Sequence, residues 1–219
     1  MAIAPVARDD ARWGYLDLDA RRYERRRYGG PGRRFNLFLL ERAVRRALNG
    51  IGHDALVLHM PSGTGILGRT LAQRGMRVVD SDISPAMLEV SRERGHAVGQ
   101  VRADLEMPPY RQRTFAAVLC TRYLMHAGPE RRPRVLATLA NLTDGPLIAT
   151  YCHPYTMKSL MRAFRRWLGW PAKRSPRVDG AAVAAEVAAA GLHLERVISV
   201  LPLFSEVWVV VIRTPTRVP

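Results

Sequence analysis

One stretch, residues 55–82, constrains the fold more than any other part of the chain. It opens with a short apolar run, Ala55–His59, which is typical of a buried parallel strand. A glycine-containing turn follows at 61–65, then a helix over Ile66–Arg74 and a second apolar strand over Met76–Asp80. Glycines let a backbone turn sharply and approach a ligand closely, and a helix N-terminus offers free N–H groups. The order of strand, glycine turn, helix, strand and acid predicts the first half of a nucleotide-binding α/β sheet.

The glycine turn by itself leaves the nucleotide open. Gly63, Gly65 and Gly68 satisfy the pattern G-x-G-x-x-G, and Asp82 follows at about the spacing expected of a dinucleotide site. An acid at this strand tip is suited to accept hydrogen bonds from ribose hydroxyls. An NAD-type cofactor therefore stays possible on this motif alone.

The rest of the chain alternates helices and strands and then closes with two adjacent strands. Further helices are predicted over Ala20–Tyr28, Phe35–Leu48, Pro85–Arg94, Pro129–Leu142, Met157–Trp170 and Ala181–Ala190, and strands over Gln100–Ala103, Phe115–Thr121, Pro146–Tyr151, Arg196–Phe204 and Glu206–Arg213. The last two, joined by a tight turn near Ser205, must pair antiparallel. The predicted fold class is α/β, a Rossmann-like doubly wound seven-stranded sheet, mostly parallel with a C-terminal antiparallel hairpin.

Size and composition favour one main domain. With 219 residues, 47% of them hydrophobic, the chain can bury one good core. We expect residues 1–50 to form an arginine- and aromatic-rich arm plus a helix that acts as a lid, and residues 51–219 to form the main domain. No signal peptide and no run of about 18–20 apolar residues is evident, so we expect a cytoplasmic protein. Cys120 and Cys152 lack metal-ligand spacing, which predicts buried thiols and no metal site.

The charge is strongly positive, and two segments concentrate it. The net charge is +15, and Lys158 and Lys173 are the only lysines, so nearly all of this charge comes from arginine. Residues 8–34 interleave arginine with Trp13, Tyr15, Tyr23 and Tyr28, which fits a solvated helix face, a lid over a ligand cleft, or an RNA-binding arm through residues 21–34. Residues 157–170 form a basic amphipathic helix, which either covers a cleft or lies on a membrane surface.

Four landmarks give the chain a family resemblance. They are PSGTG at 61–65, DISPAML at 82–88, RADLEMPP at 102–109 and FAAVLCTRYLMH at 115–126. Together with the strand order, they resemble the class I S-adenosylmethionine-dependent methyltransferases, in particular the type 11 and type 25 methyltransferase domains, over roughly residues 50–213. The resemblance implies S-adenosyl-L-methionine as the cofactor.

The resemblance also implies site residues. The loop after the first strand would lie beneath the methionine part of the cofactor, Asp82 would bind the ribose, Ile83 and Asp104 with Leu105 would surround the adenine, and the end of the fourth strand would form the floor near the methyl group. The implied cofactor-binding residues are Pro61, Ser62, Gly63, Gly65, Asp82, Ile83, Asp104, Leu105, Cys120 and Thr121. From their positions in the arm and after the predicted strands, the candidate acceptor-binding residues are Tyr28, Arg122, Tyr123, Tyr151 and Tyr155.

One position departs from the family pattern. The first strand of relatives often ends in an acid, two residues before the glycine loop, whereas this chain has His59 followed by Met60 and Pro61. The change removes a carboxylate that usually contacts the loop and the cofactor ammonium. Either the cofactor binds more weakly or another group reshapes the site.

Two histidines are candidates for the general base. His126 follows the fourth predicted strand and His153 follows the fifth, and the ends of both strands face the same crevice. A histidine can take a proton near neutral pH, which a hydroxyl acceptor would require. Alternatively, both histidines only pack, and methyl transfer then depends on alignment alone.

The sequence therefore predicts an enzyme, an S-adenosylmethionine-dependent methyltransferase that methylates an oxygen of a small-molecule or lipid-like metabolite. An adenine N6 methyltransferase is disfavoured, because Met107-Pro108-Pro109-Tyr110 precedes the fourth strand instead of following it. The alternatives are an RNA methyltransferase that uses the basic arm, a non-catalytic cofactor-binding partner or regulatory subunit, and, last, an NAD(P)-dependent oxidoreductase.

Overall fold

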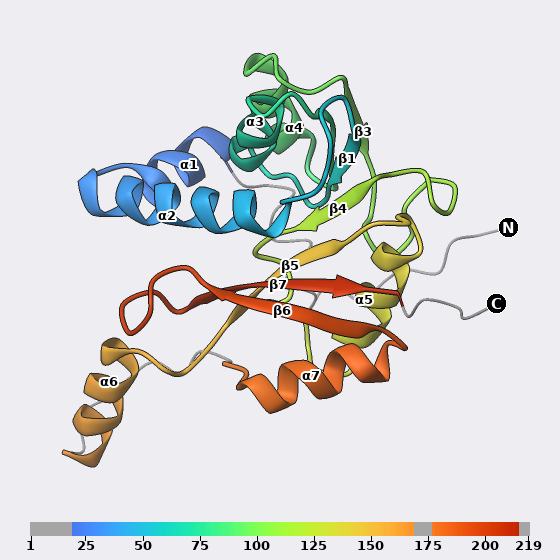
Figure 1. Ribbon diagram of the computed structural model, residues 1–219. Coiled ribbons are helices and arrows are strands. Elements are labelled where there is room, and N and C mark those ends of the chain that lie inside the picture. The colour runs from blue at the N-terminus through green and yellow to red at the C-terminus, as the bar shows by residue number, and fades with distance from the viewer. Residues whose placement is uncertain (1–18, 169–176, 215–219) are drawn as a thin grey trace, which may run out of the picture.

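The computed structural model describes residues 19–168 and 177–214 and shows one seven-stranded sheet with helices on both faces (Figure 1). The strands are β1 Leu56–His59, β2 Arg77–Asp82, β3 Gly99–Arg102, β4 Ala117–Cys120, β5 Leu147–Cys152, β6 His193–Ser199 and β7 Val207–Arg213. Their order is β3-β2-β1-β4-β5-β7-β6. The first five strands pair in parallel, and β7 pairs antiparallel with both β5 and β6. The predicted fold class is confirmed.

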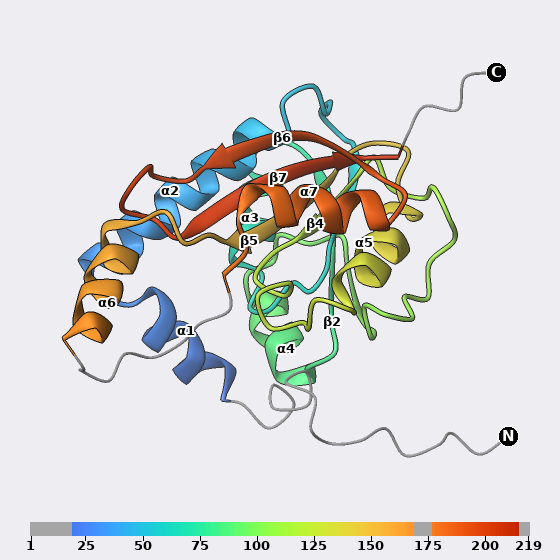
Figure 2. The ribbon, with the colours of Figure 1, turned by 90° about the horizontal axis from the view of Figure 1, so that it is seen from below.

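The sheet is buried on both faces by helices with apolar stripes. On one face, α2 (Pro31–Ala47) and α3 (Ile66–Ala72) contribute side chains such as Leu40 and Leu71 to the core. On the other, α5 (Arg132–Ala140) and α7 (Gly180–Ala189) contribute side chains such as Leu136. Figure 2 shows α7 crossing the sheet, while α2 lies on its other side. Because both faces are covered at the centre of the sheet, the central parallel strands β1, β4 and β5 are mostly apolar runs.

Helix starts follow the local sequence chemistry. Ser84 caps α4 (Pro85–Glu93) by accepting a hydrogen bond from the Met87 N–H, as the Ser-Pro pair predicts. Asp19 caps α1 (Ala20–Tyr28) in the same way through the Arg22 N–H. The α2 helix starts at Pro31, earlier than the predicted start at Phe35, because proline fits the first turn of a helix.

The strand order positions a crevice at the centre of the sheet. The chain runs from β1 to β2 and β3 on one side and then returns to β4 on the other side of β1. In such sheets ligands bind beyond the carboxyl ends of the strands at this switch point. The loops that follow β1, β2, β3 and β4 meet there.

The predicted tight turn near Ser205 is wrong. Strand β6 ends at Ser199, and the segment 200–206 forms a longer connection before β7. Leu203 has a positive φ of 64°, and both Leu203 and Phe204 are exposed. Val200 still packs against the core, but Leu203 and Phe204 do not contribute to it.

Part of the predicted arm lies outside the described residues. Trp13 and Tyr15 belong to this part, and so does the predicted end of the basic helix at Trp170; the described helix α6 spans Met157–Trp167. In the described part of the chain, no helix is long and apolar enough to cross a bilayer.

Candidate active site

A pocket occupies the crevice at the carboxyl ends of β1, β2, β3 and β4. Helix α1 contributes Tyr23 and Tyr28 to it. Of the predicted site residues, those that line the pocket are Tyr28, Pro61, Ser62, Gly63, Asp82, Ile83, Asp104, Leu105, Thr121, Arg122, Tyr123 and His126. The topology thus brings together segments that are far apart in sequence.

The glycine loop is held by the neighbouring strand. The Gly63 N–H donates to Oδ2 of Asp82 at 2.7 Å, and the Ser62 N–H donates to the Ser81 carbonyl at 2.8 Å. Gly63 has φ 54° and Gly65 has φ 76°, which glycine adopts without steric cost. The chain therefore turns sharply here because glycine permits it, and the hydrogen bond to Asp82 holds the loop in this conformation.

Asp82 is buried at the tip of β2 and faces the pocket. Besides the Gly63 N–H, it accepts the Ser84 N–H on Oδ1 at 3.0 Å. Burial raises its pKa, and these backbone hydrogen bonds oppose the rise. A carboxylate has about four lone-pair sites, so Asp82 can still accept hydrogen bonds from a ligand. The residue fits the diol-binding position of a nucleoside cofactor.

His59 belongs to a buried polar group that we call the His59 cluster: His59, Asp80, Ser91 and His96. Oδ1 of Asp80 lies 3.0 Å from Nδ1 of His59, and its Oδ2 lies 2.8 Å from Nε2 of His96 and accepts the Ser91 hydroxyl. Burial disfavours the Asp80 carboxylate, but hydrogen bonds from His59, His96 and Ser91 hold its pKa well below the usual range. The carboxyl group of Asp80 is therefore ionised at neutral pH.

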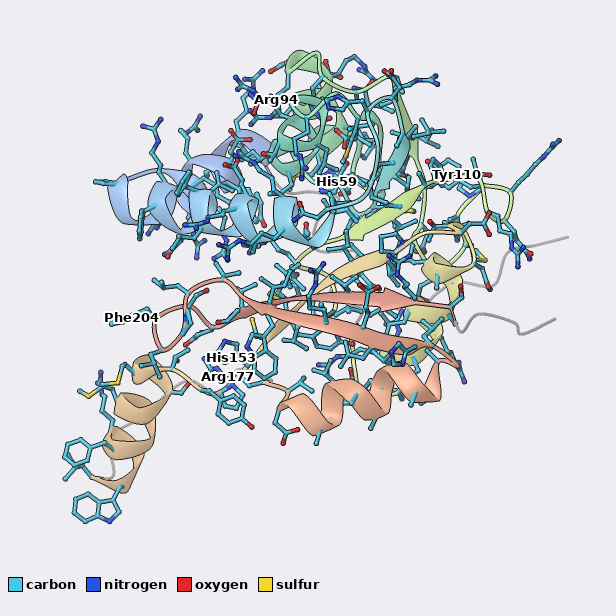
Figure 3. All side chains as sticks on the ribbon, viewed as in Figure 1. His59, Arg94, Tyr110, His153, Arg177 and Phe204 are labelled. Carbon is cyan, nitrogen blue, oxygen red and sulfur yellow. The ribbon has the colours of Figure 1, made fainter. Side chains whose placement is uncertain are left out.

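The ionised Asp80 sets the hydrogen positions of its neighbours. Because a carboxylate only accepts, His59 donates through Nδ1. In neutral His59, Nε2 then carries the free lone pair, and this nitrogen is buried without a hydrogen-bond partner among the described residues. His59 lines the pocket (labelled in Figure 3), so it offers an acceptor atom where relatives often have an acid.

Sequence reasoning noticed His59 but missed its partner. The carboxylate absent from β1 is present one strand away, at Asp80, whose position is paired with that of His59 in the sheet register. The signal was the second acid, two residues before Asp82. Tyr23 and the apolar residues Met60 and Met87 also line the pocket without having been predicted as site residues.

The segment after β4 forms the other end of the pocket. Arg122 has a positive φ of 63°, and its N–H donates to Oγ1 of Thr150 at 2.7 Å. Nε of Arg122 is buried without a hydrogen-bond partner in the described part of the chain. Strained backbone of this kind, which costs about 1–3 kcal/mol, is concentrated at functional sites.

Positive charge dominates this end. Burial lowers the pKa of His126, and the charges of Arg122 and Arg27 lower it further. Burial and the charge of Arg122 likewise lower the pKa of Arg27. Among the described residues, neither Arg27 nor Arg122 forms an ion pair. Arg122 and His126 line the pocket, whereas Arg27 is exposed beside them and does not line it. We call these three residues the cationic end of the pocket, with His126 itself neutral at pH 7.

A buried arginine supports the same segment from behind. Nε of Arg132 donates to the carbonyls of Leu124 at 2.9 Å and Ala127 at 3.0 Å, and its Nη1 lies 2.9 Å from Oε1 of Glu186. The side chain is almost completely buried. Arg132 therefore ties the loop after β4 to α5 and α7.

Five predicted site residues do not line the pocket. His153 stacks on Trp208, with ring centroids 4.4 Å apart, and accepts the Tyr155 N–H on Nδ1. Tyr151 and Cys120 are buried in the core, where burial raises the pKa of both, that of Cys120 to about 12. Gly65 faces His96 and Ser91 instead of the pocket. The structure thus separates His126 from His153, and their catalytic roles stay predictions.

The comparisons with known proteins agree with this arrangement. The family described as "Methyltransferase domain" matches residues 57–144, the segment from β1 to just beyond α5. A search of curated proteins finds no match.

Solved structures show the same fold. The Synechocystis magnesium protoporphyrin IX methyltransferase, crystallised with bound SAH, is 20% identical, with a TM-score of 0.73 over 92% of this chain and 97% of that one. The putative methyltransferase in a Haloferax volcanii complex with the activator Trm112 is 15% identical, with a TM-score of 0.67 over 93% and 98%. A TehB-like methyltransferase from Corynebacterium glutamicum is 18% identical, with a TM-score of 0.62 over 89% and 97%.

The family match covers the loops that hold the pocket, and the sheet ends in the antiparallel pair expected of the resemblance. The chain carries a methyltransferase domain over residues 57–144, and its fold is that of solved S-adenosylmethionine-dependent methyltransferases.

Proposed function

We propose that this enzyme methylates an oxygen of a small acidic metabolite, with a carboxylate as the acceptor group. The observation that carries the proposal is the cationic end of the pocket. Nε of Arg122 is buried there without a hydrogen-bond partner among the described residues, next to a second arginine, Arg27. A buried guanidinium nitrogen without a hydrogen-bond partner is costly, and a bound carboxylate would accept its charge-assisted hydrogen bond.

The other end of the pocket suits S-adenosylmethionine. Asp82 would accept hydrogen bonds from the ribose hydroxyls, Ile83 and Leu105 would contact the adenine, and loop 61–65 would lie beneath the methionine part. When bound, this cofactor supplies an electrophilic methyl group and its own leaving group. The remaining task of the protein is to align the acceptor and to exclude water. Tyr23 and Tyr28 line the pocket from α1 and would exclude water from it, which is the role expected of a lid.

A carboxylate acceptor fits the chemistry of the cationic end. Carboxylic acids have pKa values near 4, so the acceptor oxygen is already ionised at neutral pH and needs no base. Arg122 would orient it and raise its local concentration. His126 would add one hydrogen bond through its neutral ring.

A phenolic or alcoholic acceptor is the second candidate, and one observation favours it. Burial and the two arginines lower the pKa of His126, which keeps its ring unprotonated and able to take a proton at neutral pH. In this case the rate should fall when His126 is replaced. The two candidates differ in what Arg122 and His126 each contribute.

The test begins with calorimetric titration using S-adenosylmethionine, S-adenosylhomocysteine and NADH. We expect the first two to bind and NADH not to bind. Methyl-labelled cofactor is then offered with a panel of aromatic and aliphatic carboxylic acids, matched phenols and the corresponding carboxylate esters. Methyl esters release methanol in mild alkali, whereas methyl ethers do not, so the product itself identifies the acceptor oxygen.

Two variants separate the candidates. Arg122→Gln should abolish methylation of acids while cofactor affinity stays unchanged, and Arg122→Lys should restore part of the rate. His126→Gln should have little effect on acids. Turnover of phenols alone, lost in His126→Gln but kept in Arg122→Gln, would contradict the carboxylate proposal.

A further inference from the structure

Helix α6 and the loop before β7 form an exposed apolar surface at one end of the domain. In Figure 1, α6 stands off from the layers that cover the sheet, and Figure 2 also shows it at the margin. We propose that this surface docks the enzyme on an anionic lipid bilayer. The inference concerns where the enzyme is located and does not depend on the proposed acceptor.

The exposed side of α6 carries an apolar stripe. Met157, Met161, Phe164 and Leu168 follow each other at spacings of four, three and four residues, which places them on one face of a helix. All four are exposed. Trp167 is 79% exposed, and its ring stacks on that of Phe164 with centroids 5.9 Å apart. A soluble surface rarely leaves an ordered stripe of this kind uncovered.

The loop before β7 extends the stripe. The Met157 N–H donates to the Leu203 carbonyl at 2.9 Å, so the loop contacts the base of α6. Leu203, Phe204 and, on the near side, Tyr155 are all more than half exposed. Figure 3 shows Phe204 near the start of α6, pointing away from the sheet. We call these eight residues, Tyr155, Met157, Met161, Phe164, Trp167, Leu168, Leu203 and Phe204, the docking surface.

The docking surface concentrates the exposed apolar side chains of the described chain. Eight of the thirteen large hydrophobic residues that are exposed belong to it. Two others, Phe35 and Phe38, lie on the first turns of α2, whose N-terminal end is at the same end of the domain in both views. Random scatter of surface apolar residues would not give this concentration.

The charge around the docking surface selects its partner. From Met157 to Leu168 the sequence has four basic residues, Lys158, Arg162, Arg165 and Arg166, and no acid. Elsewhere in the chain, segment 21–34 has seven arginines and one acid. An anionic bilayer can bind both the apolar stripe and the basic residues, because apolar side chains enter the boundary of the acyl chains and basic side chains interact with the headgroups. RNA would use the arginines and the rings, but it offers no place for a Met and Leu stripe.

The experiment is co-sedimentation of the full-length protein with vesicles, monitored by tryptophan fluorescence. One set contains phosphatidylcholine alone, and the other contains phosphatidylcholine mixed with phosphatidylglycerol. We expect binding to the anionic vesicles, a shift of the emission to shorter wavelength as Trp167 leaves water, and much weaker binding to the neutral vesicles. Binding should weaken as salt is added.

Three variants sharpen the test. Phe164→Ser/Trp167→Ser should lower the partition coefficient about tenfold or more, because two aromatic anchors are lost. Arg162→Gln/Arg166→Gln should weaken binding to anionic vesicles only. Met107→Ser, which alters an equally exposed residue outside the docking surface, should bind like the wild type. Equal melting temperatures and equal S-adenosylhomocysteine affinity would show that the variants fold.

Three outcomes overturn the proposal. They are an absence of vesicle binding, equal binding by the wild type and Phe164→Ser/Trp167→Ser, and binding to a single-stranded RNA oligonucleotide without binding to vesicles. Failure of methyl transfer with every acceptor would leave these readouts unchanged, so the two proposals can fail separately.

Discussion

His59 and Asp80 face each other across paired positions of β1 and β2, with Nδ1 and Oδ1 3.0 Å apart and both side chains buried. The relationship explains how the chain tolerates a histidine where the resemblance implies an acid. The negative charge is retained, but one strand away, and His59 lies between it and the pocket. Several measurable properties should depend on this pair.

Replacing Asp80 should destabilise the fold. In Asp80→Asn, the amide has one acceptor oxygen, while three donors, from His59, His96 and Ser91, converge on the site. Leaving buried donors unsatisfied costs about 1–3 kcal/mol for each group, so we expect a loss of roughly 2–4 kcal/mol. Urea denaturation of the wild type and of Asp80→Asn measures this difference in the free energy of unfolding. Asp104→Asn, at a less buried acid of the same pocket, is the control and should change stability by less than about 1 kcal/mol.

The Asp80 contribution should also depend on pH. Its pKa in the folded protein lies below the value of about 3.9 expected in the unfolded chain. The stabilisation is therefore complete above about pH 5 and is lost as the pH falls below 4 toward the folded pKa. The difference in unfolding free energy between wild type and Asp80→Asn should shrink between pH 5 and pH 3. A constant difference over this range would show that the carboxylate charge is not involved.

Gly68 should not tolerate even one extra carbon. A Cβ there would lie 2.6 Å from both Oδ1 of Asp80 and Nε2 of His96, side-chain atoms that are already fixed by the His59 cluster. Gly68→Ala should therefore lower the free energy of unfolding by about 1–3 kcal/mol, despite the better helix propensity of alanine. Gly99→Ala, where a Cβ meets open space, is the matched control and should be nearly neutral. Thermal melts of the two variants give the comparison.

Asp82 should contribute to cofactor affinity as well as to folding. In Asp82→Asn the single amide oxygen can accept only one of the two backbone N–H groups, those of Gly63 and Ser84, and the charge that faces the pocket is lost. A hydrogen bond to a charged group contributes about 1.5–3 kcal/mol, so S-adenosylhomocysteine affinity should fall roughly tenfold to a hundredfold. Calorimetric titration measures the affinity, and a thermal melt checks the fold. Unchanged affinity would remove Asp82 from the ribose-binding position.

The pKa of His126 should respond to its arginine neighbour. Burial lowers this pKa first, and the positive charges of Arg122 and Arg27 lower it further. Removing one charge in Arg122→Gln favours the protonated ring, so the pKa of His126 should rise toward the usual value of about 6.5. Proton NMR titration of the ring follows the change, with His126→Gln used to assign the signal. A pKa that stays constant would show that Arg122 lies too far away to shape the cationic end.

The sequence predicted the elements that depend on local patterns. Helix α1 has the predicted bounds, Ser84 caps α4 as expected, and β7 ends at the predicted Arg213, because caps, turns and apolar runs are read within a few residues. The longer connection before β7 was missed, since an apolar segment gives the same signal in a strand and in an exposed loop. The sequence of this connection alone does not show that Leu203 and Phe204 are exposed.

The sequence predicted pocket residues that depend only on their position at the end of a strand. It did not predict residues that act through contacts with one another. Asp82 and the loop 61–65 reach the pocket as expected from their positions at strand ends. The contact of His59 with Asp80 depends on strand register, and that of His96 depends on how α4 returns to the sheet. Neither is encoded by spacing along the chain. His153 shows the converse, because a strand-end position does not decide which way a side chain turns.

The Arg132 anchor has a consequence for how this enzyme can diversify. Arg132 links the loop after β4 to α5 and α7. Substitutions that change the conformation of this loop should therefore destabilise the whole domain. Tyr23 and Tyr28 reach the same pocket from α1, near the start of the described chain, without contributing to a strand. Libraries aimed at new acceptors should therefore vary α1 first, and natural relatives that share this sheet should differ most in acceptor choice at that helix.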